Sequence, residues 1–144
     1  MTGPSIINGR CLCGAVTVQA HAPKPILRAC HCDMCRQHTS GMFISIATEQ
    51  EGMVIDGPAV SFQSSEWAER GFCGTCGSTL WYGTKHDGAR HLAAGLFEQA
   101  AGARLKLEFF SDMCPQGYGL KGDHRRLNTR ETLEMFEGSE GDET

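Results

Sequence analysis

Residues 30 to 36 have the sequence Cys30-His31-Cys32-Asp33-Met34-Cys35-Arg36, in which three thiols fall within six positions. A gap of one residue followed by a gap of two lets a tight turn direct three thiolates to one point. Such a set of sulfur ligands suits a soft, tetrahedral ion such as zinc. Structural zinc sites close their shell with four ligands, whereas catalytic sites keep one position for water or substrate. The stretch therefore predicts a metal site whose fourth ligand has to be identified.

Four further cysteines form two pairs, each beside a glycine at the corner of an expected strand. They are Cys11 and Cys13, in Cys11-Leu12-Cys13-Gly14, and Cys73 and Cys76, in Cys73-Gly74-Thr75-Cys76-Gly77-Ser78. Paired knuckles of this kind close one tetrahedral shell, and a zinc–thiolate site contributes folding free energy directly. We therefore predict a structural four-thiolate zinc that fastens the first strand to the middle of the sheet.

Three interpretations of Cys30, Cys32 and Cys35 are open from spacing alone. The first is an open zinc site with an exchangeable fourth position. The second is a closed site whose fourth ligand is Cys114 or a histidine. The third is redox chemistry, because Cys32-Asp33-Met34-Cys35 is itself a C-x-x-C sequence that can cycle as a disulfide.

The sequence leads to separate predictions for His31, Arg36, Cys114 and the remaining histidines. His31 is a candidate ligand or gate, and Arg36 is a candidate for lowering a thiol pKa or holding a substrate carboxylate. Cys114 is expected to be a small buried apolar residue. The sequence 124–126, His-Arg-Arg, is expected to be a solvated charge cluster. No metal is expected at the remaining histidines, which are His21, His38, His86, His91 and His124.

Composition excludes several classes of protein. The net charge of −4 lacks the basic surplus that binding to a phosphate backbone needs, so nucleic acid is not an expected partner. The first ten residues resemble no signal peptide, and no apolar run approaches the roughly 18 residues of a membrane span. Seven of the eight cysteines have C-x-C or C-x-x-C spacing, which indicates metal or redox chemistry in a cytoplasmic protein before it indicates disulfides.

The expected secondary structure is mostly β, because 18 glycines imply many turns and the apolar runs are short. Strands are predicted at residues 15–20, 26–29, 42–47, 53–56, 59–63, 79–82, 91–96 and 105–110. Residues 37–41 and 115–123 are predicted to be loops. Residues 130–136 are predicted to form one or two helical turns capped by Asn128 or Thr129. We expect a single domain over residues 1–136, followed by a disordered acidic tail over 137–144.

Three cysteine motifs together resemble the family of glutathione-dependent formaldehyde-activating enzymes and its centromere protein V relatives. They are the C-x-C-G knuckle at Cys11, the Cys-His-Cys-x-x-Cys-Arg turn with Ser40-Gly41-x-Phe43 behind it, and Phe72-Cys73-x-x-Cys76-Gly77-Ser78-x-Leu80. The likeness spans about residues 9 to 98. After Glu98 the sequence departs from the family pattern, because a histidine of the next strand is replaced and a later tryptophan is missing.

The resemblance implies a Mss4-like, or β-tent, fold of antiparallel sheets joined at zinc knuckles. It also implies two zinc ions per chain, a structural one on Cys11, Cys13, Cys73 and Cys76 and a catalytic one on Cys30, Cys32 and Cys35. The activity that it implies is a carbon–sulfur lyase reaction, the reversible condensation of glutathione with formaldehyde to S-hydroxymethylglutathione.

The leading hypothesis is therefore a zinc-dependent lyase acting on an adduct between a thiol, such as glutathione, and an aldehyde. Two hypotheses from other classes stand beside it. One is a non-catalytic zinc module that binds glutathione or a protein partner. The other is a redox sensor that uses Cys32 and Cys35.

Overall fold

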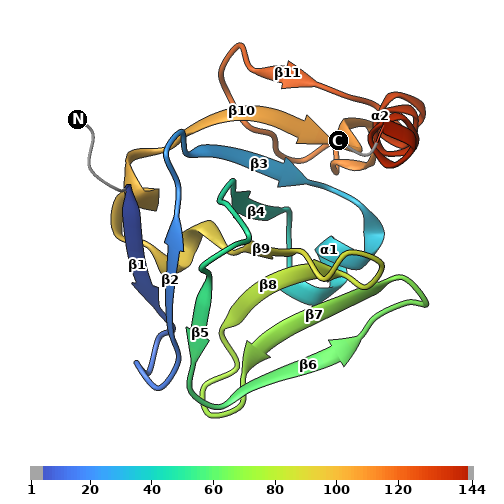
Figure 1. Cartoon of the computed structure of the whole chain (residues 1–144). Coiled ribbons are helices and arrows are strands. Elements are labelled where there is room, and N and C mark those ends of the chain that lie inside the picture. The colour runs from blue at the N-terminus through green and yellow to red at the C-terminus, as the bar shows by residue number, and fades with distance from the viewer. Residues whose placement is uncertain (1–4, 143–144) are drawn as a thin grey trace. The chain divides into compact units, whose positions relative to one another are not determined.

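The computed structural model describes residues 5–142, and this range is mainly β, which confirms the predicted fold class (Figure 1). The strands are β1 Ile6–Arg10, β2 Thr17–His21, β3 Ile26–Cys30, β4 Phe43–Ile46, β5 Val54–Asp56, β6 Ala59–Gln63, β7 Ala68–Cys73, β8 Thr79–Thr84, β9 Arg90–Leu92, β10 Arg104–Phe109 and β11 Arg125–Arg126. The α-helices are α1 Asp33–Thr39 and α2 Thr129–Asp142.

These strands form three sheets, with the orders β1-β2-β5, β11-β10-β3-β4 and β6-β7-β8-β9. The first and third sheets pair antiparallel throughout, as expected for strands joined by short turns. In the second sheet, β10 and β11 pair in parallel. The predicted antiparallel architecture is therefore confirmed, with one parallel pair added near the C-terminus.

The chain divides into two compact units, which we describe separately. Unit 1 holds the residues up to Leu27 together with Ile44–Arg104, and unit 2 holds Arg28–Phe43 together with the chain from Leu105 onward. Strands β3, β4 and β10 contain the points at which the chain passes from one unit to the other. The single domain expected over residues 1–136 stays a prediction.

The core of unit 1 is made by apolar residues of its strands, which alternate with exposed residues in β2 but not in β8. In β2, Val18 and Ala20 are buried while Thr17 and Gln19 are exposed, as a period of two requires for a strand with one covered face. In β8, Leu80 and Trp81 are both buried. This unit carries both of the two-cysteine knuckles.

Unit 2 is organised around β10 and α2. The ring of Phe136 on α2 packs against Phe109, with 5.2 Å between ring centroids, and the backbone N–H of Phe110 donates to Thr132 Oγ1 at 2.9 Å. Asn128 caps the helix, because its Oδ1 accepts from the backbone N–H of Glu131 at 2.8 Å. The predicted cap and the predicted C-terminal helix are both present.

The loop predicted over residues 37–41 is wrong, because α1 spans Asp33–Thr39. Cys32 has extended backbone angles, and its Sγ accepts from the backbone N–H of Cys35, so the helix begins inside the three-cysteine turn. Ser40 ends it in the left-handed conformation. The sequence concealed this helix because a cysteine takes the place of the usual Ser, Thr, Asp or Asn at the cap.

Other boundaries also differ from the sequence-based expectation. Strand β1 was not expected, and the strand predicted over 91–96 ends at Leu92, after which Ala94–Leu96 forms a 3₁₀ turn. Helix α2 continues to Asp142, well past residue 136, so the expected acidic tail is helical over 137–142. Residues 143–144 of that tail lie outside the described residues.

The two α-helices are short and carry many polar residues. Across residues 5–142, no helix is both long enough and apolar enough to cross a membrane. Cytoplasmic localisation stays a prediction.

Candidate metal centres

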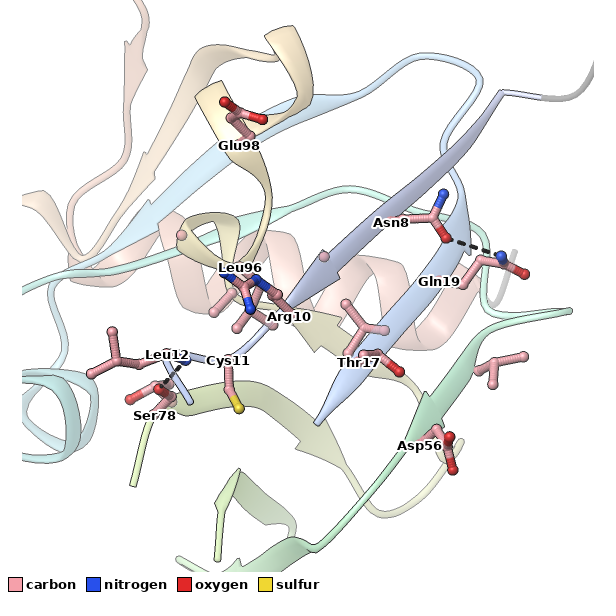
Figure 2. A pocket seen from close by; sticks show the side chains of 16 residues that line it. Asn8, Arg10, Cys11, Leu12, Thr17, Gln19, Asp56, Ser78, Leu96 and Glu98 are labelled. Carbon is pink, nitrogen blue, oxygen red and sulfur yellow. Dashed lines mark hydrogen bonds between the residues drawn. The ribbon is translucent and has the colours of Figure 1, made fainter. Parts of the chain in front are cut away.

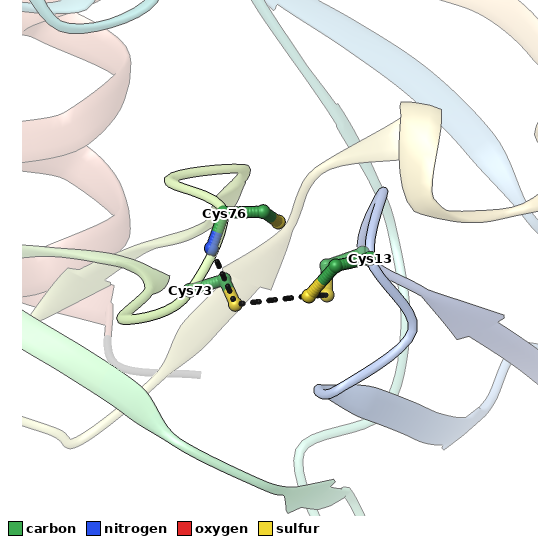
Figure 3. A group of neighbouring side chains, drawn as sticks. Cys13, Cys73 and Cys76 are labelled. Atoms are coloured by element: carbon green, nitrogen blue, oxygen red, sulfur yellow. Dashed lines mark hydrogen bonds between the residues drawn. The ribbon is translucent and has the colours of Figure 1, made fainter.

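The first cysteine cluster lies in unit 1 and joins two strand corners. Its four sulfur atoms all lie within 4.8 Å of one another, and they belong to Cys11, Cys13, Cys73 and Cys76. Cys11 and Cys13 lie in the corner between β1 and β2, Cys73 is the last residue of β7, and Cys76 lies in the turn before β8. Figure 3 shows side chains of the two corners facing one another, with Cys13 Sγ 3.9 Å from Cys73 Sγ. The predicted association of the two knuckles is present.

Backbone N–H groups point at the sulfurs of this cluster. Val16 N lies 3.3 Å from Cys11 Sγ, and the N–H groups of Thr75 and Cys76 lie 3.3 and 3.4 Å from Cys73 Sγ. Donors aimed at sulfur favour the thiolate over the thiol. Each knuckle therefore directs backbone donors at one of its sulfurs, and the hydrogen bond from Val16 N lowers the pKa of Cys11.

Gly77 and Ser78, which follow Cys76, complete the second knuckle. Gly77 has a φ of 81°, a left-handed conformation that suits glycine, and its N–H donates to Cys73 O at 2.9 Å. Ser78 Oγ lies 3.1 Å from Cys76 Sγ, and hydrogen bonds from the Ser78 side chain and backbone lower the pKa of Cys76 to about 5. Ser78 Oγ also accepts from Leu12 N at 3.1 Å and so links the two knuckles directly.

The second cysteine cluster lies in unit 2, at the junction of β3 and α1. The sulfur atoms of Cys30, Cys32 and Cys35 all lie within 4.8 Å of one another. Cys30 ends β3, Cys32 is the N-cap of α1, and Cys35 lies in its first turn and is buried. The strand thus delivers one thiol and the start of the helix delivers two.

Both donor sets fit a zinc ion. The pKa of the Cys30 thiol is raised because its sulfur is hydrogen-bonded to those of Cys32 and Cys35 and is buried, so three thiolates cannot coexist here without a compensating cation. Thiolates held this closely are the ligands of tetrahedral zinc sites. The four-cysteine cluster supplies a complete shell, whereas the three-cysteine cluster supplies three of its four corners.

Among the side chains that the structure describes, those of residues 5–137, no fourth protein ligand reaches the three-cysteine cluster. No other cysteine, histidine, aspartate or glutamate ligand atom in that range joins the set within 4.8 Å. Cys114 is half-buried, and its Sγ lies 3.4 Å from Tyr118 O. The closed site with Cys114 or a histidine as ligand therefore has no geometric support in that range.

His31, expected as a ligand or gate, makes a different contact. Its side chain is 1% exposed, and its Nε2 lies 2.7 Å from Oε1 of Glu108 on β10. Its backbone N–H donates to Phe109 O at 3.1 Å. Arg36 pairs with Asp33 across the exposed face of α1, with Nη2 3.3 Å from Oδ1.

The expected solvated cluster at residues 124–126 is wrong for His124. Its side chain is 3% exposed and is hydrogen-bonded through Nε2 to Glu108. Arg125 and Arg126 are exposed as expected, although Arg126 Nε also lies 3.2 Å from Glu108 Oε2. The sequence analysis also missed Glu108, because it falls on the polar side of the alternation in Leu105-Lys106-Leu107-Glu108-Phe109 and so seemed exposed.

A pocket of about 1170 Å³ lies in unit 1 along β1 and β2 (Figure 2). Its wall includes Cys11 of the four-cysteine cluster and the charged residues Arg10, Asp56 and Glu98. Asn8 and Gln19 are hydrogen-bonded to each other across the two strands at 3.0 Å. None of the three cysteines of the other cluster is among the residues that line it.

Antiparallel sheets with cysteine clusters at their corners define a protein of the Mss4-like fold class. A crystal structure of a Rhodobacter sphaeroides protein supports this class, with a TM-score of 0.53 and 18% identity over 69% of this chain and 100% of the other. The sequence model of the glutathione-dependent formaldehyde-activating enzymes matches residues 6–113. The chain therefore belongs to this family, and the match extends beyond both ends of the three cysteine motifs.

Two relatives are similar over part of the chain. An uncharacterized lyase of Schizosaccharomyces pombe is 39% identical over 76 residues, which cover 52% of this chain and 56% of the relative. A Halomonas elongata protein, provisionally named a glutathione-dependent formaldehyde-activating enzyme, is 30% identical over 86 residues, covering 53% of this chain and 55% of that protein. The chain thus spans about half the length of these curated relatives.

Proposed function

We propose that this protein is a zinc-dependent carbon–sulfur lyase that makes and breaks the bond between a thiol and an aldehyde carbon. The observation that carries the proposal is the three-cysteine cluster, in which three sulfurs converge within 4.8 Å and no fourth ligand atom joins them from the side chains of residues 5–137. Three ligands with an open corner are the arrangement of catalytic zinc sites, whereas the four-cysteine cluster has the composition of a structural one.

The proposed role of Cys30, Cys32 and Cys35 is to hold the ion with one corner facing the substrate. When bound, the ion supplies positive charge that favours the thiolate form of an incoming thiol near neutral pH. Three cysteine thiolates leave a zinc site with one net negative charge, which weakens its ability to polarise a carbonyl. We therefore assign the open corner to capture of the thiol.

The reaction balances without any redox partner. The sulfur of the thiol bonds to the aldehyde carbon, the carbonyl π electrons become a lone pair on oxygen, and the thiol proton ends on that oxygen to give a hydroxymethyl thioether. The reverse reaction breaks the same carbon–sulfur bond. Holding the thiol at a fixed point converts an encounter of two molecules in solution into attack within one complex.

Glutathione and formaldehyde are the substrates that we propose. Family membership and the printed name of the Halomonas elongata relative support this pair. The printed name of the Schizosaccharomyces pombe relative supports the broader class of lyase.

Exchange spectroscopy tests this proposal. Two-dimensional NMR exchange between free glutathione and S-hydroxymethylglutathione should be faster with a catalytic amount of the zinc-loaded protein. Replacing Cys32 with Ser should abolish the acceleration and remove one zinc ion per chain, because a hydroxyl is a much poorer ligand for zinc than a thiolate. Cys114→Ser is the matched control, since Cys114 lies outside both clusters, and it should retain zinc and activity.

Each alternative hypothesis predicts a different experimental result. Stoichiometric glutathione binding without faster exchange would identify a carrier module and refute the lyase. Zinc release on mild oxidation, with a reversible disulfide between Cys32 and Cys35 seen by mass spectrometry, would identify a redox sensor. Unchanged zinc content and exchange in Cys32→Ser would show that the catalytic site is misassigned.

A further inference from the structure

A carboxylate in the interior of unit 2 joins three basic side chains that come from two separate segments. Glu108 is 3% exposed. Its Oε1 lies 2.7 Å from His31 Nε2, and its Oε2 contacts His124 Nε2 and lies 3.2 Å from Arg126 Nε. His31 belongs to the turn between Cys30 and Cys32, whereas the other two partners lie on or next to β11.

The charge state of Glu108 fixes the direction of these hydrogen bonds. Burial raises the pKa of its carboxyl, but hydrogen bonds from His124 and His31 outweigh burial and bring the pKa below its ordinary value. An ionised carboxylate has only acceptors, so both histidines must donate to it through Nε2–H. Glu108 therefore holds the His31 ring through a hydrogen bond at Nε2.

Among the described side chains, those of residues 5–137, no second hydrogen bond holds the His31 ring. Its Nδ1 is buried and has no hydrogen-bond partner in that range. Within that range, the bond to Glu108 is thus the single side-chain hydrogen bond that orients the ring. The Glu108 contact and the backbone bond from His31 N to Phe109 O attach the Cys30–Cys32 turn to consecutive residues of β10.

The segment that supports Glu108 lies beyond residue 113, where the family match ends. β11 pairs with β10 so that Arg126 is opposite Glu108, and Leu127 N donates to Glu108 O at 2.9 Å. Arg126 is itself held by the carbonyl oxygens of Leu120 and Gly122, at 2.9 and 3.0 Å. The loop from 115 to 123 therefore takes part in fixing the carboxylate.

We infer that Glu108, held by His124 and Arg126, is a positioning residue for the three-cysteine metal site, because it fixes the His31 ring and with it the turn that carries Cys30 and Cys32. The inference rests on the proposed metal at this cluster. It assigns a role to the C-terminal segment 124–126, which orients ligands from outside the region shared with the family. Groups that orient metal ligands in this way typically change metal affinity by roughly 10- to 100-fold when they are replaced.

Glu108→Gln is the variant that tests this role. An amide places one oxygen and one NH₂ group where three donors converge, so at least one histidine loses its acceptor. We expect cobalt(II) affinity at the three-cysteine site, followed by its thiolate-to-cobalt charge-transfer absorption, to fall roughly 10- to 100-fold. We also expect ¹⁵N NMR of the histidine rings to show loss of the hydrogen bond at His31 Nε2.

The four-cysteine site is an internal reference in every titration, because its ligands lie in unit 1. Its cobalt affinity should be unchanged in Glu108→Gln. Glu134→Gln is the matched surface control, since Glu134 is exposed and pairs with Arg130 at 3.1 Å, and it should change neither site. Glu108→Asp, which keeps the charge, should recover part of the affinity.

Two results would overturn the inference. One is folded Glu108→Gln with wild-type cobalt affinity at the three-cysteine site and an unchanged hydrogen bond at His31 Nε2. The other is an equal loss of affinity at both sites, which would show general destabilisation. If Glu108→Gln does not fold, the same measurements are made on Arg126→Gln. This variant is expected to fold, because the Arg126 side chain is partly exposed. A smaller loss confined to the three-cysteine site supports the inference, and no site-specific loss overturns it.

Cobalt binding requires neither a thiol substrate nor an aldehyde. If the wild-type protein fails the exchange assay but Glu108→Gln selectively loses cobalt affinity at the three-cysteine site, the proposed lyase is refuted and the positioning role stands. A protein that catalyses exchange normally with Glu108→Gln and binds cobalt like wild type would refute only the positioning role.

Discussion

Glu108 shows how a charge is accommodated inside unit 2. Removing a carboxylate from water costs several kcal/mol unless donors replace the lost hydration. His31, His124 and Arg126 supply those donors, and a backbone hydrogen bond fixes the residue in β10. Because Glu108 is the acceptor that the three side chains share, replacing it removes one hydrogen bond or ion pair from each of them.

Gly71 is the second single residue on which local structure depends. It lies opposite Trp81 in the β7–β8 pair, and a Cβ added there would fall 2.3 Å from atoms of the Trp81 ring. Gly71→Ala should therefore lower the free energy of unfolding by about 1–3 kcal/mol, the usual result of overpacking a core. Urea denaturation of the zinc-loaded protein measures the change.

Gly95→Ala is the control for this prediction, because a Cβ at Gly95 meets no atom within 4 Å. It should change the free energy of unfolding little. If Gly71→Ala is as stable as the wild type, then β7 and the Trp81 ring of β8 can move apart at this point at little cost in free energy.

At the scale of elements, the two cysteine clusters are built by different means. The four-cysteine cluster uses two turns, each closed by a backbone hydrogen bond to a cysteine carbonyl oxygen: Gly14 N to Cys11 O and Gly77 N to Cys73 O. The three-cysteine cluster uses the end of a strand and the first turn of α1. Turns at strand corners supply four sulfurs, whereas a strand followed by a helix supplies three, with no further protein ligand from the side chains of residues 5–137.

Helix α2 begins with a reciprocal cap that can be tested directly. Asn128 Oδ1 accepts from Glu131 N at 2.8 Å, and Glu131 Oε1 accepts from Asn128 N at 2.9 Å. Asn128→Ala should destabilise the protein by about 1 kcal/mol, because a helix N–H loses its partner. Chemical denaturation measures this loss.

Asn128→Asp keeps an acceptor at the same place and should stay within a few tenths of a kcal/mol of the wild type. An aspartate variant as unstable as the alanine variant would mean that the side-chain bond to Glu131 N does not carry the effect. The same denaturation curves provide this comparison.

At the scale of the whole molecule, each compact unit carries its own cysteine cluster. Zinc-bound protein should contain two ions per chain, and a strong chelator should remove them in two phases. The ion on Cys30, Cys32 and Cys35 should leave first, because its open corner admits a competing ligand. Elemental analysis gives the starting content, and a colorimetric zinc indicator follows the release.

Loss of exchange activity should accompany the fast phase, while thermal stability should fall mainly in the slow phase, because structural zinc contributes folding free energy. Cys32→Ser should show only the slow phase. A single ion per chain, or release of both ions at one rate, would contradict the assignment of one open and one closed site.

The sequence alone determined the fold class and both thiol clusters. Short apolar runs between glycines indicate strands, and cysteine spacing is a local property that survives in any arrangement of the chain. Seven thiols in C-x-C and C-x-x-C spacing therefore predicted the grouping that the structure shows. The cap of α2 was predictable for the same reason, since capping depends on residues three apart.

Only the tertiary structure decided the surroundings of the three-cysteine cluster. The local sequence pattern assigns Glu108 and His124 to the surface. Their side chains are buried because the pairing of β10 with β11 brings them together with His31, which is 77 residues from Glu108 in the sequence. α1 was also hidden, because its N-cap is the cysteine Cys32. Burial of a charge depends on partners distant in sequence, and no local periodicity reports which partners the fold supplies.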